Sequence, residues 1–527
     1  MLREVKLVMN VVGVSAKKME LRLRNYGFIV YKQKKSIEVY VGKRGSEELF
    51  KFIIPLKLIK DPQLGSILAK KLAENGDEFL AANSSSIAEA LAQCLQSWKD
   101  LLVKKEIEKL LSTPYEEEAG GIDVSALKHA EFEKVLEAVS KTFSPKIAEL
   151  LEIVMTVGLT LKQVDREKGV FDNRPVWLAI VADPSTYKTS TLRMLKDSKY
   201  VFYAQSFTPA SILPAKEDVE PLIAYMNNRI FIIPTLSEEL ADKDLAKKLF
   251  AALESVYDGE YAKSTGLSGL KRETVDTVVI AAVTPAVWEW VLPYIVNIGS
   301  RWLVYRYSLS DEEALQVQKN LDDARIMPAF RKLISTYFDY LLENTTYLHL
   351  KEVLMSDEHD QDLRILARLV SRLRAVWRVE TYWETDEYGR KTAHKEIEVM
   401  QVEAPSRAYQ QLKNFVKANT LLRKSSVEKI VGIPVVDEHA MKLAAKLAVS
   451  STTNKLKEVL LCIAEKQARG ETASYTDLVR ATGLSRGSVE NLVKVLRHPR
   501  VDLVEDNELR VNDPFFTVIK KYLLQAS

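Results

Sequence analysis

The middle of the chain alternates short apolar runs with amphipathic stretches. Three apolar runs have the composition of buried strands, namely Val176–Val181, Arg229–Ile233 and Thr277–Val283. Apolar residues at helical spacing lie between them, as in Asp244–Tyr257. Strands that are apolar along their whole length and alternate with helices are typical of a parallel sheet covered on both faces. We therefore expect an α/β fold with a parallel αβα core.

The N-terminal region predicts a separate, smaller α+β domain. Residues 1–60 indicate a short helix followed by strands at Gly27–Gln33, Ser36–Gly42 and within Leu49–Ile59. Residues 66–111 carry a largely helical pattern. A linker at Ser112–Gly121 combines a proline, an acidic triplet and a glycine pair, so we expect a domain boundary near residue 118.

The C-terminal half is mostly helical in pattern. From Asp311 to about Val449 only the polar stretch Glu384–Lys395 interrupts it. The last segment predicts helices at Tyr475–Thr482 and Arg486–Leu496, with a turn at Gly483–Ser485 and a β-wing formed by Val501–Val504 and Glu508–Val511. This is the pattern of a winged helix-turn-helix.

In such a domain the second helix would direct Arg486, Ser488 and Lys494 toward a DNA groove. The apolar residues Leu484, Val489, Leu492 and Leu496 would form its core. A winged helix used for protein contacts has the same pattern, and both interpretations remain open. The expected domains are thus residues 1–118, an α/β core at 119–310, a helical lid at 311–450 and a winged helix at 451–527.

Composition excludes several classes of protein. With 527 residues, 47% hydrophobic and 28% charged, the sequence is that of an ordinary globular protein of several domains. It has no apolar run of transmembrane length and no signal-peptide pattern at its start, so we expect a cytoplasmic protein without a membrane partner. The two cysteines, Cys94 and Cys462, and six scattered histidines have no zinc-ligand spacing, which argues against disulfide frameworks and metal-stabilised modules.

Charge is unevenly distributed along the chain. The formal net charge is only +3, yet residues 1–60 hold 14 Lys and Arg against 5 Asp and Glu, a net charge of +9. Tyr26, Phe28, Tyr31 and Tyr40 are interleaved with these basic residues. Such a mixture suits phosphate neutralisation and base stacking in a nucleic-acid-binding surface. A solvated basic face over a core that contains the aromatic residues explains it equally well.

The candidate chemistry lies directly after the first apolar run. The turn Ala182–Tyr187 leads to Lys188, Thr189 and a helical pattern. A strand, a tight turn and a helix that opens on Lys-Thr form the layout of a phosphate-binding P-loop. There the lysine neutralises phosphate and the hydroxyl group binds Mg²⁺. The usual pattern is G-x-x-x-x-G-K-[ST], but Ala182 and Tyr187 stand at the glycine positions, so an ordinary strand–turn–helix also fits this segment.

Several segments together carry a resemblance to a known family. Residues from about 142 to 450 resemble the ATPase core of the minichromosome-maintenance (MCM) helicases, which belong to the AAA+ class. The matching segments are Ser144–Ile147 before the loop, Ala182–Thr189 (G-D-P-G-x-A-K-S in the family), Leu253–Glu254 with Tyr261–Lys263, Ala281–Pro285, Ile298–Trp302, Leu363–Leu366 and Val436–Glu438. The family also ends in a winged helix.

The resemblance implies a site for ATP and Mg²⁺. Asp183, Pro184, Ser185, Thr186 and Tyr187 would form the loop around the phosphates with Lys188, and Thr189 would ligate the metal ion. Glu238, or its neighbour Glu239, would orient the attacking water and Thr284 would sense the γ-phosphate. Arg301 would reach into the neighbouring subunit and Arg364 would complete the pocket from the lid. An arginine supplied in trans implies a homo-oligomer, most simply a hexamer.

The same resemblance implies that Lys263, Lys271 and Arg272, on a hairpin within Asp258–Arg272, track DNA phosphates. An exposed polar turn explains these residues as well. This chain departs from the family pattern at three places. It lacks the loop glycines, it has Pro234-Thr235 where an Asp-Glu pair is expected, and its N-terminal region lacks the zinc-binding cysteines.

Three functions follow from these observations. The first is an ATP-driven, ring-forming DNA helicase or translocase of a replication system, archaeal or on a mobile element, with weakened hydrolysis and replication proteins as partners. The second is an AAA+-like scaffold that has lost hydrolysis and holds DNA or a replication partner. The third is a transcriptional or plasmid-copy regulator that acts mainly through residues 451–527.

Overall fold

The structure is a computed structural model. The residues that it describes are 10–14, 18–23, 26–32, 36–43, 49–55, 63–74, 80, 82–96, 132–163, 174–204, 206–212, 221–237, 240, 242–265, 269–297, 301–321, 326–385, 391–423, 429–430 and 433–524. The chain forms two compact units, Met1–Ala130 and Glu131–Ser527. The boundary predicted near residue 118 lies outside the described residues. The predicted core, lid and C-terminal segment all belong to the second unit.

The first unit is a five-stranded antiparallel meander in the order β1-β2-β3-β4-β5. Its elements are β1 (Asn10–Val14), β2 (Lys18–Leu23), β3 (Tyr26–Lys32), β4 (Ser36–Lys43), β5 (Leu49–Pro55), α1 (Leu64–Ala73) and α3 (Ser84–Gln96). β1 and β2 lie before the strands that were predicted, and the short helix expected at the start has no counterpart among the described residues, which exclude 1–9. Met19, Leu21 and Leu23 alternate with polar residues, which is the period of a strand.

One face of this sheet forms a core with the two helices. The core contains Phe28, Val30, Ile37, Val39, Val41, Phe52, Ile54, Leu64, Leu68, Leu72, Ile87, Leu91 and Leu95. Tyr31 and Tyr40 are half-buried and make an edge contact, with ring centroids 5.7 Å apart. Phe28 is therefore a core residue, whereas the two tyrosines lie on the other face. Lys51 lies over the Tyr40 ring and forms an ion pair with Glu38, so this face combines aromatic rings and charge.

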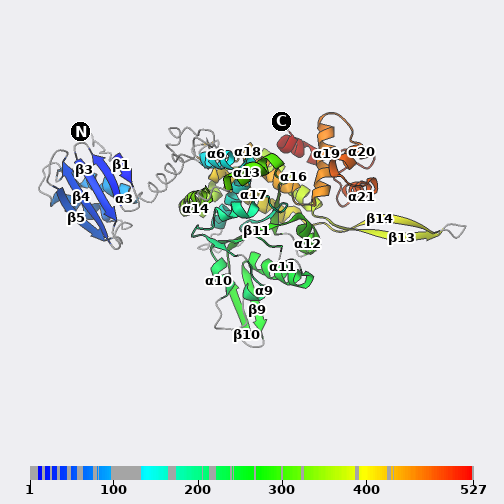
Figure 1. Cartoon of the computed structure of the whole chain (residues 1–527), viewed down its shortest axis with the longest axis horizontal. Coiled ribbons are helices and arrows are strands. Elements are labelled where there is room, and N and C mark those ends of the chain that lie inside the picture. Colours follow the sequence, from blue (N-terminus) through cyan, green and yellow to red (C-terminus); the bar gives the residue numbers. More distant parts are fainter. Residues whose placement is uncertain are drawn as a thin grey trace. The chain divides into compact units, whose positions relative to one another are not determined.

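The second unit is built on a five-stranded parallel sheet in the order β12-β6-β11-β8-β7 (Figure 1). Its strands are β6 (Trp177–Val181), β7 (Val201–Tyr203), β8 (Arg229–Ile233), β11 (Thr277–Val283) and β12 (Trp302–Arg306). Every residue of β6, β11 and β12 is buried. The predicted α/β class and parallel sheet are thus confirmed, and the bounds of β8 and β11 agree with the predicted ones.

Helices cover both faces of this sheet. On one face lie α9 (Pro209–Ile212), α10 (Leu222–Met226), α11 (Lys243–Tyr257) and α12 (Pro285–Asn297), which share a core with alternate strand residues. On the other face lie α7 (Pro145–Leu159), which packs against β6 and β11, and α8 (Lys188–Arg193). The short helix α9 buries Ile212 in the core on its face of the sheet.

The lid helices surround this core. They are α6 (Phe132–Thr142), the 3₁₀ turn Thr160–Gln163, α13 (Asp311–Leu321), α14 (Ile326–Asn344), α15 (Tyr347–Glu352), α16 (Asp357–Leu373), α17 (Pro405–Leu422) and α18 (Glu438–Val449), with a short pair of strands at β15 (Lys429–Ile430) and β16 (Ile433–Pro434). Helix α17 packs against α7 and α16, and α18 packs against β12. The lid is thereby fixed to both the sheet and its covering helix.

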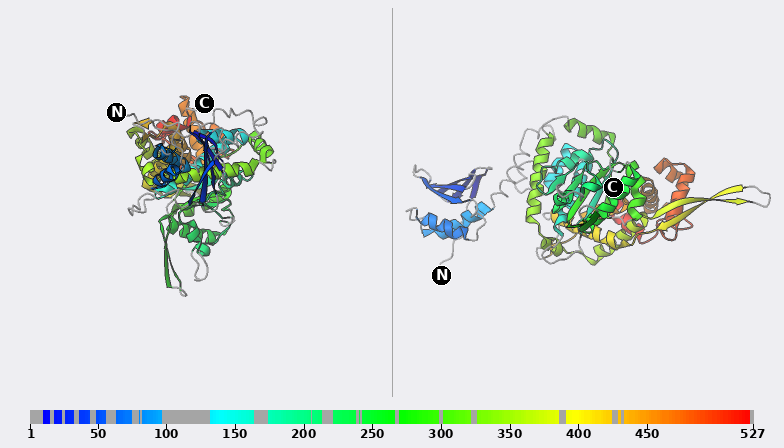
Figure 2. Two further views of the ribbon diagram at one scale, coloured as in Figure 1. Left: turned by 90° about the vertical axis from the view of Figure 1, so that its left-hand side faces the viewer. Right: turned by 90° about the horizontal axis from the view of Figure 1, so that it is seen from below.

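The mostly helical pattern expected between Asp311 and Val449 fails at β15 and β16 and, over a much longer stretch, between α16 and α17. The strands β13 (Val376–Thr385) and β14 (Lys391–Gln401) form a long antiparallel hairpin between α16 and α17. Figures 1 and 2 show it projecting from the second unit. The polar stretch near Glu384 is the outer part of this hairpin rather than a break between helices. We call residues 376–401 the arm.

The C-terminal segment consists of α19 (Asn454–Ala468), α20 (Tyr475–Thr482), α21 (Arg486–Arg497), α22 (Phe515–Ile519) and a π-helical turn at Lys520–Leu524. Gly483 ends α20 with φ at +67°, a left-handed conformation that favours glycine. In place of the two expected wing strands, the segment has an isolated bridge between Val504 and Val511. Among the described residues, the helices are all too short or too polar to span a bilayer.

Candidate functional site

The loop that follows β6 takes a backbone conformation that usually requires glycine. Among the described residues other than glycine, four have positive φ, and Ser185 and Tyr187 are two of them, each at 62°. In the family pattern Ser185 replaces a glycine, and in the general P-loop pattern Tyr187 replaces another. A bulky residue in the left-handed region is uncommon. The loop therefore keeps a glycine-type backbone at both positions without the glycines.

Lys188 is held inside this turn. It is 9% exposed, and its Nζ donates hydrogen bonds of 2.8 Å to the carbonyl oxygens of both Ala182 and Asp183. Burial lowers the pKa of the Lys188 ammonium, and the nearby Asp183 carboxylate only partly offsets that effect. Asp183, Pro184 and Ser185 are exposed around it. The turn thus places one buried cation beneath a solvent-facing backbone loop.

Thr189 connects the loop to the end of β8. Its hydroxyl group donates a 3.2 Å hydrogen bond to the carbonyl oxygen of Pro234. The amide of Ala182 donates to Val283 at the end of β11, over 3.3 Å. The carboxyl ends of the three neighbouring strands therefore meet at one edge of the sheet. In open parallel sheets, ligands bind outside this edge.

Thr284 lies at the same edge. It follows β11, is half-buried, and its amide donates to Ser237 Oγ over 3.4 Å. The amide of Leu236 donates to the carbonyl oxygen of Ala282 over 2.9 Å, which ties the segment after β8 to β11. The structure thus brings Lys188, Thr189 and Thr284 to one edge, as their order in the chain implies.

The described residues that directly follow β8 at this edge include no carboxylate. β8 ends at Ile233 and continues into buried Pro234 and exposed Thr235. Glu238 and Glu239 lie outside the described residues. Within the part of the chain that the structure describes, no cluster of His, Cys, Asp and Glu could hold a metal ion.

Two tyrosines fasten the loop to neighbouring elements. Tyr307, just after β12, donates a 2.7 Å hydrogen bond to the carbonyl oxygen of Thr186. Tyr187 donates to the carbonyl oxygen of Ala314 in α13, over 3.2 Å. Thr186 also closes the turn, since its hydroxyl group donates to Asp183 over 2.7 Å. These three hydrogen bonds restrain the loop backbone, which carries Ser185 and Tyr187 at the positions where the patterns have glycine.

Arg301 lies at the opposite edge of the sheet. It precedes β12, which runs parallel to β6, so it is far along the strand direction from the loop of its own chain. Its guanidinium pairs with Asp258 at 2.9 Å and with Glu254 at 2.8 Å, and it lies over the Tyr257 ring. At 6% exposure it is held within its own chain. Its predicted role in trans stays a prediction that requires release from these carboxylates.

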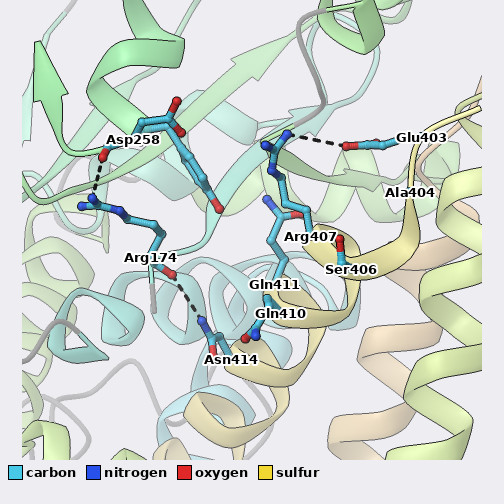
Figure 3. Close-up of a pocket in the computed structure, with 10 residues that line it drawn as sticks. Arg174, Asp258, Glu403, Ala404, Ser406, Arg407, Gln410, Gln411 and Asn414 are labelled. Carbon is cyan, nitrogen blue, oxygen red and sulfur yellow. Dashed lines mark hydrogen bonds and ion pairs between the residues drawn. The ribbon is translucent and has the colours of Figure 1, made fainter. Parts of the chain in front are cut away.

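A pocket of about 480 Å³ opens beside Arg301 (Figure 3). Its lining is polar and includes Asp258, the partner of Arg301, and two further arginines, Arg174 and Arg407. Arg407 pairs with Glu403 at 3.8 Å, and the carbonyl oxygen of Arg174 accepts a 3.2 Å bond from Asn414. Gln411 donates to the carbonyl oxygen of Arg301. The pocket volume lies within the general range of small-molecule sites.

Sequence reasoning missed Arg174 and Arg407. Arg174 precedes β6 and Arg407 lies in the first turn of α17, so 233 positions of sequence separate them. The usable signal was the start of α17, where Pro405 at the first helical position predicts a helix N-terminus directly before Arg407.

Arg364 lies elsewhere, on the exposed side of α16. It pairs with Asp360 at 2.8 Å and lies over the Tyr409 ring, 4.7 Å from its centroid. These described contacts are with α16 and α17, and none of them joins Arg364 to the loop. Its predicted role in the nucleotide pocket stays a prediction.

The expected hairpin is present as β9 (Glu260–Thr265) and β10 (Gly269–Thr274). Lys263 and Lys271 are cross-strand partners, and Arg272 is exposed. The hairpin projects from the core on the side of α11 (Figure 1). Its predicted contact with DNA remains a prediction.

On α21 the three predicted DNA-binding residues are all exposed. Arg486 pairs with Glu490 at 3.0 Å, and Ser488 shares a 2.9 Å hydrogen bond with the capping residue Ser485. Lys494 is exposed, whereas Val489, Leu492 and Leu496 are buried and Leu484 is half-buried. The helix therefore has a polar outer face with two basic residues, as its spacing predicted.

Comparison with known proteins adds little. No family model and no curated protein matches the sequence. Among solved structures, one titled "SCCmec type IV Cch - active helicase" matches with a TM-score of 0.29 and 10% sequence identity, over 87% of this chain and 82% of that chain. A TM-score of 0.29 is too low to indicate a shared fold.

Proposed function

We propose that this chain is an MCM-like AAA+ ATPase that assembles into a ring and translocates on DNA during replication. The observation that carries the proposal is the loop after β6. Its positive-φ residues place Lys188 and Thr189 at the edge where β6, β8 and β11 end. This is where a parallel sheet binds its ligand.

The residues at this edge fit a nucleotide phosphate. Lys188 is a buried cation whose hydrogen bonds to its own loop can be exchanged for bonds to phosphate oxygens. Thr189 carries the hydroxyl group that would ligate Mg²⁺ with ATP bound. Helix α8 is short, from Lys188 to Arg193, so its dipole contributes little and the lysine carries most of the attraction.

The arginine pocket supports assembly into a ring. Arg301, Arg174 and Arg407 lie around the amino edge of the sheet, away from the chain's own loop. Two different surfaces that complement each other make a head-to-tail contact, which closes into a ring under rotation. In such a ring the arginine pocket of one subunit faces the phosphates held by the next. A hexamer is the proposed size.

DNA is the proposed substrate. The hairpin of β9 and β10 carries Lys263, Lys271 and Arg272, which would neutralise backbone phosphates without reading sequence. The exposed Arg486 and Lys494 of α21 would add a second basic contact. Replication proteins would be the further partners of such a ring.

The decisive experiment measures ATP binding and hydrolysis. Wild type should bind ATP and hydrolyse it faster with single-stranded DNA, and Lys188→Ala should lose both properties. Lys196→Ala is the matched control, because Lys196 is an exposed lysine three residues beyond the end of α8 that lies over the Tyr203 ring. Equal background rates in wild type and Lys188→Ala would reject the motor.

A second candidate is an ATP-binding scaffold without hydrolysis. It is favoured by Pro234, which occupies the end of β8 where the family carries the carboxylates that bind metal and orient water. Such a scaffold would bind ATP in a Lys188-dependent way and assemble on DNA, yet show no turnover above background. The same assay, run with a separate binding measurement, separates the two candidates.

A further inference from the structure

The arm is a two-stranded ribbon with a defined register. Each strand has ten or eleven residues, which corresponds to a length of roughly 30 Å. Its root is fixed, because Arg500 donates to the carbonyl oxygens of Val399 and Met400, and β13 and β14 lie beside α12 and α21. A free two-stranded hairpin is only marginally stable in water. The outer part therefore gains from a partner surface.

The two faces of the arm differ in character. Val379 pairs across the strands with Ile397, and Trp377 with Val399, so these four residues share one face with Trp383. The pair Thr381 and Lys395 lies on the same face, between Val379 and Trp383. On β14 this face is covered, with Ile397 at 9% and Val399 at 3% exposure. On β13 it is open, with Val379, the cross-strand partner of Ile397, at 41% and Trp383, farther from the root, at 65%.

The opposite face is charged and internally paired. Arg378 forms ion pairs with Glu380 at 2.5 Å and with Glu398 at 2.7 Å. Tyr382, 51% exposed, lies on this face because successive residues of a strand alternate. One face of the arm thus suits water, whereas the other presents a tryptophan and a valine side chain to a partner.

Both ends of the arm lead to the rim of the arginine pocket. Arg374, two residues before β13, donates to the carbonyl oxygen of Trp302, the residue after Arg301. Arg374 also pairs with Glu403, which lies two residues after β14 and lines the pocket. The arm therefore projects from the surface that, in the proposed ring, faces the neighbouring subunit.

We infer that the arm is an assembly element whose apolar face, through Val379 and Trp383, packs on a second copy of this chain. The inference rests on the ring of the proposed function, because the arm continues the surface around its arginine pocket. Charge argues against DNA as the occupant. Residues 376–401 hold six acidic and four basic side chains, a net charge of −2 that phosphates would repel.

The test compares two glutamate substitutions in neighbouring positions of the full-length chain. Trp383→Glu puts a charge on the apolar face, and Tyr382→Glu puts the same charge on the polar face of the same strand. Sedimentation velocity with ATP and Mg²⁺ should show that Trp383→Glu weakens self-association about tenfold or more, as expected for an aromatic anchor. Tyr382→Glu should assemble like wild type. Equal behaviour of the two variants would overturn the inference.

A photo-cross-link identifies the occupant directly. With p-benzoylphenylalanine in place of Trp383, irradiation should give a covalent dimer of the chain, with and without DNA. A cross-link only to added DNA, only within the same chain, or to neither would overturn the inference.

The outcomes also separate this inference from the proposed function. If no cross-linked dimer forms while ATP still binds in a Lys188-dependent way, only the arm contact is rejected. A cross-linked dimer in a chain that binds no ATP rejects the ATPase and leaves the arm contact standing.

Discussion

The hydroxyl group of Tyr307 donates a 2.7 Å hydrogen bond to the carbonyl oxygen of Thr186, so the residue directly after β12 holds the loop after β6. Tyr307 is 8% exposed, and burial raises the pKa of its phenol far above the ordinary value. This direction favours the neutral phenol, the form that can donate the bond.

Tyr307→Phe should weaken ATP binding several-fold and lower the free energy of unfolding by about 1 kcal/mol, because it removes one buried hydrogen bond. Tyr305→Phe is the matched control. Tyr305 lies in β12, two positions before Tyr307, and this substitution removes its 2.7 Å hydrogen bond to Glu149, which does not involve the loop. Titration with a fluorescent ATP analogue and urea unfolding give the two readouts. ATP affinity that falls equally in both variants would contradict the assigned role of Tyr307.

Tyr187 is held at φ 62°, where any residue with a Cβ is strained. Tyr187→Gly should therefore be more stable than Tyr187→Ala by about 1 kcal/mol, although both lose the ring and the bond to Ala314. The comparison of two truncations isolates the backbone effect. Urea unfolding of both variants measures it, and the reverse order of stabilities would show that the loop does not keep this conformation in solution.

Arg301→Ala and Lys188→Ala should each abolish ATP hydrolysis, yet a mixture of the two variants should recover part of it. In a mixed ring, some interfaces combine an intact Lys188 with an intact Arg301 from the next subunit. Arg301→Ala should also lower the free energy of unfolding by about 2 kcal/mol, since Asp258 and Glu254 lose their partner. A mixture that remains as inactive as its components would exclude a shared site.

Lys457 predicts a pH effect on stability. Burial, together with the charges of Arg306 and Lys146, lowers the pKa of Lys457 from 10.5 to about 8. Between these two values the unfolded chain holds a proton that the folded chain has lost, so this residue makes stability rise with pH there. Relative to wild type, Lys457→Met should gain stability below pH 8 and lose that advantage toward pH 10.5.

Thermal unfolding from pH 7 to pH 10 measures this difference. The control is Lys494→Met, which removes an exposed lysine. A constant difference between wild type and Lys457→Met across the range would contradict the assigned shift.

Arg486→Glu should weaken binding of duplex DNA. The slope of log K against log salt concentration should fall by the equivalent of about one to two phosphate contacts. Arg469→Glu is the control, because Arg469 is an equally charged, exposed residue at the end of α19. Fluorescence anisotropy over a series of salt concentrations provides both quantities. Unchanged affinity and slope would assign α21 to protein contacts.

Much of the core could be predicted because local pattern decides it. The strands Arg229–Ile233 and Thr277–Val283 are apolar and buried after their first residues, and the helix Tyr475–Thr482 ends at a glycine, so period, burial and capping agree. The arm was missed because Arg378, Glu380 and Glu398 give it a polar composition. Its charged residues pair with one another instead: Arg378 pairs with Glu398 across the strands, a contact that depends on register, and with Glu380 along its own strand.

The arginine pocket could not be predicted for a different reason. The carbonyl oxygen of Arg174 is bonded to Asn414, 240 positions along the chain, and only the folded sheet and α17 bring them together. Arg301 was found from its motif, but its partners Glu254 and Asp258 belong to the end of α11 and are set by tertiary packing. Motifs locate residues, whereas the contacts that restrain them come from the fold.

The glycine-free loop has a consequence for how such proteins are recognised. Ser185 and Tyr187 adopt the backbone of residues they do not resemble, since Tyr307 and α13 hold the turn from outside. Selection acting on this segment can then preserve the backbone conformation while the amino-acid residues change. A search keyed to torsion angles would gather relatives of this chain that a search keyed to glycine passes over.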